Sequence, residues 1–167
     1  MTEGTVRVSY LELARPAAPI GTQPGTERIG RERLEVSEYL DLYRLVGGPL
    51  HWDQRLKMAH CELKRLLESE HSRIYIVRDA RGQALGLCEF EGLPPEIELK
   101  NFGLVPSVQG KGLGTWLLRT ALHAEWNSNA SRVWLHTDSW DHPAAVHLYQ
   151  SAGFRIYRVQ DEPPANL

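Results

Sequence analysis

The chain has little cysteine, with only Cys61 and Cys88 among 167 residues. Two cysteines without a redox or metal-ligand spacing exclude a disulfide-stapled scaffold, so we expect free, buried thiols and a cytoplasmic protein. The sequence also lacks an apolar run long enough to span a bilayer and a signal-peptide segment at its N-terminus, which predicts no membrane partner. No H-x-x-x-H pair occurs either, and we expect no metal site.

The sequence also has no large excess of positive or negative charge. Lysine and arginine number 19 against 21 aspartates and glutamates, which gives a net charge of −2 and a pI near 6.4. This balance argues against a nucleic-acid partner. At this length we predict one domain over residues 1–167, with segments 1–4, 16–30 and 161–167 as candidates for flexibility.

Hydrophobic periodicity and turn residues predict a mixed α/β chain. We expect strands at residues 5–13, 74–79, 84–91, 96–105, 132–137 and 154–159. We expect helices at residues 38–46, 53–69, 113–126 and 143–153, the first of them capped by Ser37. Residues 16–30 are rich in Pro, Gly and Thr and predict a loop.

A glycine-rich turn, Gln109-Gly110-Lys111-Gly112-Leu113-Gly114, joins a strand-like run to an amphipathic helix. Such a turn points backbone N–H groups and the positive end of the helix dipole at one spot, as phosphate binding requires. It is not a P-loop, because Gly112 follows Lys111 where Ser or Thr is needed. It is not a full dinucleotide fingerprint, because the third glycine would fall at Thr115.

The turn does match Gln/Arg-x-x-Gly-x-Gly/Ala through Gln109, Gly112 and Gly114. It resembles the acetyl-CoA loop of the GNAT superfamily of N-acetyltransferases. A second family signature follows at the expected separation, as His142-x-x-Ala145-x-x-x-Tyr149-x-x-x-Gly153-Phe154. The family usually has Asn where this chain has His142, whose imidazole can also donate or accept a hydrogen bond. The resemblance covers residues 97–154, about a third of the chain.

This resemblance implies a GNAT fold of the α/β (α+β) class, with a mixed central sheet of about six to seven strands flanked by about four helices. It implies acetyl-CoA as cosubstrate and transfer of its acetyl group to a primary amine by direct attack in a ternary complex. The acceptor is then a small-molecule or peptide amine, and the protein is a monomer or a homodimer.

The resemblance also implies cofactor-binding positions. In the family, backbone groups near the end of the fourth strand pair with the pantetheine arm, which corresponds to Phe102 and Leu104 with Val105 adjacent. The loop and the start of the following helix would hold the pyrophosphate through Gln109, Gly110, Lys111, Gly112, Leu113, Gly114 and Thr115, and the second signature adds His142. Gly103 suits a strand that splays where a ligand approaches, or a simple bulge.

Two residues are candidates for acid–base chemistry. Glu98 lies on the expected fourth strand, where several family members carry a catalytic glutamate, and would take the proton of the amine. The alternative is a solvated strand face. Tyr149 is placed by the second signature to protonate the leaving sulfur, or it is only a core tyrosine. Trp52 and Asp53, between the first two helices, are candidates for substrate binding, and for core packing and helix capping in the alternative.

Two other functions stay open from the sequence. One is a GNAT-like module that binds and senses acyl-CoA without fast turnover. The other is a nucleotide-binding α/β domain such as an NAD enzyme, which Thr115 disfavours.

Overall fold

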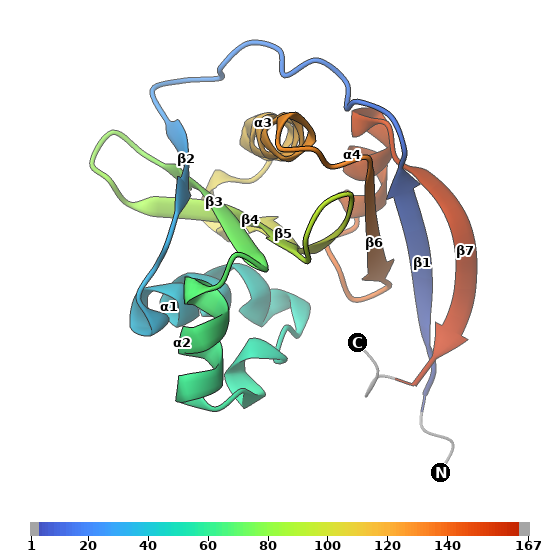
Figure 1. The fold of residues 1–167 in the computed structure, drawn as a ribbon, viewed down its shortest axis with the longest axis horizontal. Helices are drawn as coiled ribbons and strands as arrows, with labels where there is room; N and C mark the ends of the chain where they lie inside the picture. The colour runs from blue at the N-terminus through green and yellow to red at the C-terminus, as the bar shows by residue number, and fades with distance from the viewer. Residues whose placement is uncertain (1–3, 164–167) are drawn as a thin grey trace.

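The structure of the chain, a computed structural model, describes residues 4–163 (Figure 1). The predicted flexible ends fall largely outside this range, at residues 1–3 and 164–167. Within it, one sheet has the strand order β2-β3-β4-β5-β6-β1-β7. The strands are β1 (Val6–Leu13), β2 (Arg28–Glu32), β3 (Ser72–Arg78), β4 (Ala84–Glu91), β5 (Glu96–Leu104), β6 (Arg132–Asp138) and β7 (Arg155–Glu162).

Helices cover both faces of this sheet (Figure 1). They are α1 (Val36–Gly47), α2 (His60–Glu68), α3 (Leu113–Asn127) and α4 (Ala145–Ala152), with short 3-10 turns η1 (Gly48–Leu50), η2 (Arg55–Lys57) and η3 (Pro106–Val108). The predicted mixed sheet with flanking helices is confirmed. No helix in the described part of the chain is long and apolar enough to cross a membrane.

The two helical layers enclose two hydrophobic cores because side chains alternate across each strand. On β3, Ile74 and Ile76 pack under α1 and α2, whereas Tyr75 and Val77 belong to the core under α3 and α4. All four side chains are buried. The sheet is therefore the shared wall of both cores.

Strands β5 and β6 form the only parallel pair among the described strands, and they separate part-way along their length. Their pairing runs from Glu96–Arg132 to Glu98–Trp134 and then stops. Both strands continue, to Leu104 and Asp138 respectively. Beyond Glu98 the edge of β5 therefore has no strand partner, and a gap opens in the middle of the sheet.

A β-bulge follows on β5 at the point of separation. Glu89 of β4 pairs with Asn101 and Phe90 with Leu99, so Lys100 is the extra residue. Gly103 is not that bulge. A Cβ on Gly103 would lie 2.6 Å from Cγ1 of Val46, so helix α1 packs closely enough to require glycine there. The structure thus gives Gly103 a packing reason, and neither of the two interpretations from the sequence is needed.

The close approach of Val46 to Gly103 leads to a prediction about stability. We expect Gly103→Ala to lower the free energy of unfolding by about 1–3 kcal/mol, the usual cost of overpacking. Urea unfolding of the variant measures this change. Adding Val46→Ala removes the atom in the way, so the double variant should lose less than the sum of the two single variants. Strict additivity would contradict the contact.

The strand β2 was missed by the sequence analysis, which expected a loop over residues 16–30. Only Ile29 in β2 is an apolar residue, and it is half-buried at the edge of the sheet, so no alternating pattern marks the strand. The rest of that segment crosses over α3 (Figure 1). The backbone of Ala18 donates to Ala152 O at 2.9 Å, and Arg119 donates to Pro19 O at 3.0 Å, which hold it there.

Four other expectations are corrected. The predicted helix over residues 53–69 is a short 3-10 turn followed by α2, because Met58 and Ala59 between them are extended. Helix α1 begins at Val36 with no side-chain cap, so Ser37 is not its cap. Both cysteines are free, but Cys61 is exposed and only Cys88 is buried. Strand β7 extends to Glu162, so residues 161 and 162 belong to the sheet.

Candidate functional site

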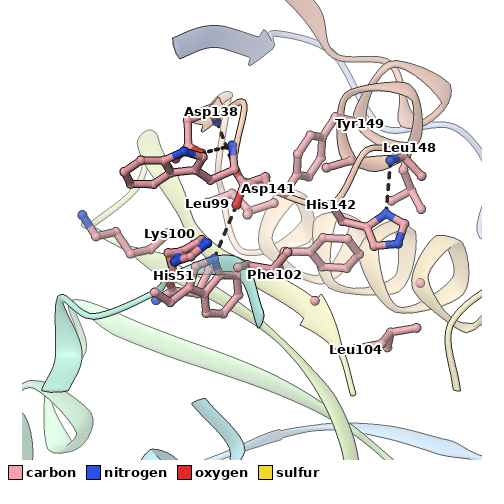
Figure 2. A pocket seen from close by; sticks show the side chains of 18 of the residues that line it. His51, Leu99, Lys100, Phe102, Leu104, Asp138, Asp141, His142, Leu148 and Tyr149 are labelled. Carbon is pink, nitrogen blue, oxygen red and sulfur yellow. Dashed lines mark hydrogen bonds between the residues drawn. The ribbon is translucent and has the colours of Figure 1, made fainter. Parts of the chain in front are cut away.

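A cleft of about 1410 Å³ opens where β5 and β6 separate (Figure 2). Its walls come from β5, β6, the glycine-rich turn at the start of α3, the segment between α1 and α2, and the turn leading into α4. Among the residues predicted from the sequence it brings together Trp52, Asp53, Phe102, Leu104, Gln109, Gly110, Gly112, Gly114, Thr115, His142 and Tyr149. Residues far apart in the sequence thus form one continuous cavity.

The glycine-rich turn presents bare backbone to this cleft. Gly110 and Gly112 both have positive φ angles, +78° and +83°, which side-chain-bearing residues adopt at a cost. A Cβ on Gly110 would meet no atom within 4 Å, and one on Gly112 would meet only Pro24, at 4.0 Å. The space above both glycines is therefore open to a ligand.

Helix α3 begins directly after Gly112, which is its N-cap. Its first intrahelical hydrogen bond is from Trp116 N to Gly112 O, at 3.2 Å, so the preceding N–H groups have no helical acceptor. The side chain of Leu113 is buried in the core, which leaves only its backbone for a ligand. Lys111 is exposed and does not line the cleft.

The free edge of β5 offers backbone groups to the same cleft. Val105 N donates to Leu85 O on the β4 side, at 2.8 Å. Because the hydrogen-bonding direction alternates along a strand, Phe102 and Leu104 direct their N–H and C=O groups away from β4, toward the gap. Gln109 Nε2 donates to Leu104 O at 3.2 Å, which ties the glycine-rich turn to the strand. Val105 does not line the cleft, and its N–H is already bonded.

Tyr149 projects from α4 into the core and reaches the cleft wall. It is 6% exposed and packs against Phe102 and Phe154, with ring centroids 5.8 and 5.9 Å away. Burial, with a smaller contribution from the charge of Asp141, raises the pKa of its hydroxyl well above the usual value. The hydroxyl therefore carries its proton at neutral pH, and it lies on the side of the cleft opposite β5 (Figure 2).

His142 stabilises the turn before α4. Its Nδ1 accepts a hydrogen bond from Ala144 N at 3.1 Å, and its carbonyl accepts one from Ala145 N at 2.9 Å. An asparagine side chain can accept the first of these bonds equally well. The departure from the family signature therefore keeps the local turn, and the ring still lines the cleft.

Glu98 lies at the last paired position of β5 and is not among the residues that line the cleft. Its neighbours Ile97 and Leu99 are buried in the core, as the alternation predicted. Its carboxylate lies 3.8 Å from Lys100 Nζ and 3.9 Å from His136 Nε2, and both of these residues do line the cleft. Burial raises the pKa of the Glu98 carboxyl, and these two groups oppose the rise.

The predicted substrate-binding residues, Trp52 and Asp53, line the cleft from the segment between α1 and α2. Trp52 Nε1 donates to Asp141 Oδ1 at 3.4 Å, which links the segment after α1 to the turn before α4. Asp141 also accepts hydrogen bonds from the Thr137 hydroxyl and the Asp138 backbone. Asp53 forms an exposed ion pair with Lys57, at 2.6 Å. Trp52 therefore has a defined partner across the cleft, while Asp53 is already paired with a lysine.

A buried polar network fixes the bulged part of β5. Glu89 is fully buried and accepts hydrogen bonds from Tyr39 at 2.9 and 3.1 Å and from Asn101, and it lies 3.5 Å from Arg55. Arg55 also contacts Glu91 at 3.4 Å. Asn101 lines the cleft, so this network sets the position of one wall.

Several cleft residues were not identified from the sequence. They are Lys100, Asn101, His136, Asp138, Trp140 and Asp141, together with His51, Gln54 and Lys57 from the segment between α1 and α2. Burial and the nearby charge of Asp141 raise the pKa of the Asp138 carboxyl. The one signal in the sequence was the alternation of β6, which places His136 and Asp138 on the face opposite the buried Leu135.

The acetyltransferase (GNAT) family model matches residues 37–154, which is more than half of the chain and includes most of the cleft. The chain belongs to the GNAT family. This GNAT protein is 28% identical to a spermidine N(1)-acetyltransferase from Vibrio cholerae serotype O1, over 111 residues. The match covers 62% of the chain and 64% of that relative. It therefore spans slightly less than two thirds of the relative's length.

Solved structures share the fold of this GNAT protein. A GCN5-related N-acetyltransferase from Sphaerobacter thermophilus aligns with a TM-score of 0.65 at 16% identity, covering 93% of this chain and 50% of that one. An aminoglycoside acetyltransferase from an uncultured soil metagenomic sample, in complex with trehalose, has the same TM-score and identity, covering 77% and 88%. At these identities the likeness shows the fold alone.

Proposed function

We propose that the chain is an acetyl-CoA-dependent N-acetyltransferase that modifies a primary amine by direct attack in a ternary complex. The observation that carries this proposal is the cleft, in which the free edge of β5 lies beside the glycine-rich start of α3. The first offers unpaired backbone groups to an extended arm, and the second offers N–H groups to phosphates. Acetyl-CoA has both an extended pantetheine arm and phosphates, so this one cosubstrate fits both features of the cleft.

The residues present fit acetyl-CoA. Open space above Gly110 and Gly112 would admit a pyrophosphate to the N–H groups at the start of α3. The backbones of Phe102 and Leu104 would pair with the pantetheine arm. Gln109 would hold the turn against β5 through its bond to Leu104 O. Gly114, Thr115 and His142 would line the same path, and Lys111 would add positive charge at its outer end. Val105 has no role here, because its N–H is bonded to Leu85 O.

A thioester supplies an activated acetyl group, so the chain's residues have to orient it and move protons. Tyr149 would donate its proton to the departing sulfur, since its buried hydroxyl is neutral at the cleft wall. The backbone N–H groups of β5 at the separation point would stabilise negative charge on the acetyl oxygen. Glu98 does not line the cleft, but its carboxylate lies 3.9 Å from His136 Nε2, and its negative charge would favour removal of a proton from the acceptor's ammonium group.

The acceptor would enter from the side of Trp52 and Asp53. Trp52 is held by Asp141, and Asp138 adds a second carboxylate nearby, so this end of the cleft suits a cationic amine. Two of the similar proteins are named for spermidine and for aminoglycosides. Both of those compounds carry several amino groups, which is consistent with this choice of substrate class.

The test is an acceptor screen with the purified full chain and acetyl-CoA. Spermidine, an aminoglycoside and a peptide with a free N-terminus and a lysine are added separately, and released CoA and acetylated product are quantified together. With at least one amine, we expect the amount of released CoA to equal the amount of acetylated amine. Double-reciprocal plots of the initial rates should intersect, as a ternary complex requires. Binding of acetyl-CoA without any amine-dependent release would instead indicate an acyl-CoA sensor. Stabilisation by NAD in place of acetyl-CoA would indicate a nucleotide-binding domain.

A further inference from the structure

The group that faces the acceptor end of the cleft at the separation of β5 and β6 is a histidine. His136 lies on β6, two residues after the last position paired with β5, and its side chain lines the cleft. Glu98 does not line the cleft, and its carboxylate is 3.9 Å from His136 Nε2. Of these two candidate bases, His136 is therefore the one that a molecule bound in the cleft can reach.

The surroundings of His136 carry more negative than positive charge. On β5 it faces the carboxylate of Glu98, and Lys100 lies 3.8 Å from that same carboxylate. On β1 the ring of Tyr10 lies 5.8 Å from the imidazole, and the Tyr10 hydroxyl donates to Glu162 of β7, whose carboxylate also interacts with His136. Asp138 follows on the same strand face. The guanidinium of Arg158 on β7 lies over the Tyr10 ring, 3.9 Å from its centroid. The carboxylates of Glu98, Glu162 and Asp138 therefore share the surroundings of His136 with two cations, Lys100 and Arg158.

We propose that His136 is the catalytic residue that accepts the proton of the acceptor's ammonium group, and that Glu98 is a positioning residue which stabilises the resulting imidazolium. This inference rests on the proposed function. One proton moves from the ammonium nitrogen to a ring nitrogen of His136, and the free amine keeps the electron pair with which it attacks the thioester carbon. The attacking nitrogen loses its second proton as the C–S bond breaks, and this proton replaces the one that Tyr149 gives to the departing sulfur. The imidazolium returns its own proton to water, so the chain ends the cycle unchanged.

Geometry and chemistry both favour this assignment over Glu98 as the direct base. The 3.9 Å separation is too long for a hydrogen bond but within the range of an ion pair, so Glu98 acts on the ring through its charge. Histidine also changes charge within the range of neutral pH, which a base that is regenerated in every cycle requires. Lys100 shares the Glu98 carboxylate, and it would limit how strongly that charge acts on His136.

The pH dependence of kcat/KM distinguishes the two assignments. In the wild type we expect an ascending limb as the imidazole loses its proton. His136→Gln should remove that limb and lower kcat/KM about 100-fold or more at neutral pH. Glu98→Gln should keep the limb, moved to lower pH, because the imidazolium has lost its negative partner. His60→Gln, at an exposed histidine on α2 outside the cleft, is the matched control and should behave as wild type.

The opposite pattern would overturn the proposal. If Glu98→Gln removes the limb while His136→Gln keeps it, the carboxylate is the direct base. If both variants keep the limb unmoved, neither residue takes part in the proton transfer. NMR titration of the His136 ring adds a readout that needs no turnover: its midpoint should fall in Glu98→Gln, and an unchanged midpoint counts against the pairing. A wild-type chain that releases no CoA with any amine would refute the proposed function, whereas this titration would still report on the pair.

Discussion

Tyr149→Phe lowers kcat about 100- to 10,000-fold if its hydroxyl protonates the leaving sulfur, because this is the usual contribution of general acid–base catalysis. The substitution keeps the ring that packs between Phe102 and Phe154, so the fold and the affinity for acetyl-CoA should change little. Steady-state kinetics with a responsive amine measure the effect, and acetyl-CoA titration followed by calorimetry measures the affinity.

A second buried tyrosine provides the control for this prediction. Tyr75 lies in the same core, and its hydroxyl donates to Glu125 at 2.8 Å, away from the cleft. Tyr75→Phe should therefore lower stability without lowering kcat. If Tyr149→Phe loses less than about threefold in kcat at unchanged stability, Tyr149 is a packing residue and the thiolate is protonated by water.

Gly112→Asp abolishes the stabilisation of the chain by acetyl-CoA. At 100 times the dissociation constant, a ligand that binds only the folded state adds about 2.7 kcal/mol to the free energy of unfolding. The carboxylate at position 112 would fill the space above the turn, repel the phosphates and compete for the N–H groups at the start of α3. The measurement is the shift in melting temperature with and without acetyl-CoA.

The Gly112→Asp variant also carries backbone strain, because it places a side chain at a positive φ angle, and this effect must be distinguished from loss of phosphate binding. Gly82, in the turn between β3 and β4, has a φ of +85° and equally open surroundings, but it lies outside the cleft. Gly82→Asp therefore carries a comparable conformational cost and should keep the full shift on adding acetyl-CoA. A folded Gly112→Asp variant with an undiminished shift would refute a phosphate site at the glycine-rich turn.

The sequence was informative where a function depends on consecutive residues. The glycine-rich turn has positive φ angles at Gly110 and Gly112, and a local motif of glycines is enough to predict such a turn. The order of the elements other than β2 was also predictable, because burial on one face leaves periodic apolar positions such as Ile97 and Leu99. Gly153 ends α4 in the left-handed conformation, with a φ of +116°, which is the usual role of a glycine that follows a helix.

Predictions from local sequence patterns were wrong or incomplete where contacts between distant segments determine the structure. Strand β2 is held by pairing to β3 and has almost no apolar residue of its own. The helix expected over residues 53–69 is interrupted just after Arg55, whose buried side chain makes ion pairs with Glu89 and Glu91 on β4. Gly103 was assigned to a ligand or a bulge from the sequence; it lines the cleft, and it also leaves the space that Val46 of α1 occupies.

The sequence by itself determined the family, the order of the elements other than β2 and the glycine-rich turn at the start of α3, since each depends on residues close together in the chain. Only the tertiary structure decided which side chains share the cleft. His136 meets Glu98 because β5 and β6 pair in parallel and then separate, and Trp52 meets Asp141 across 89 positions of sequence. Contacts between distant segments are set by strand order and register, and no local pattern of residues encodes them.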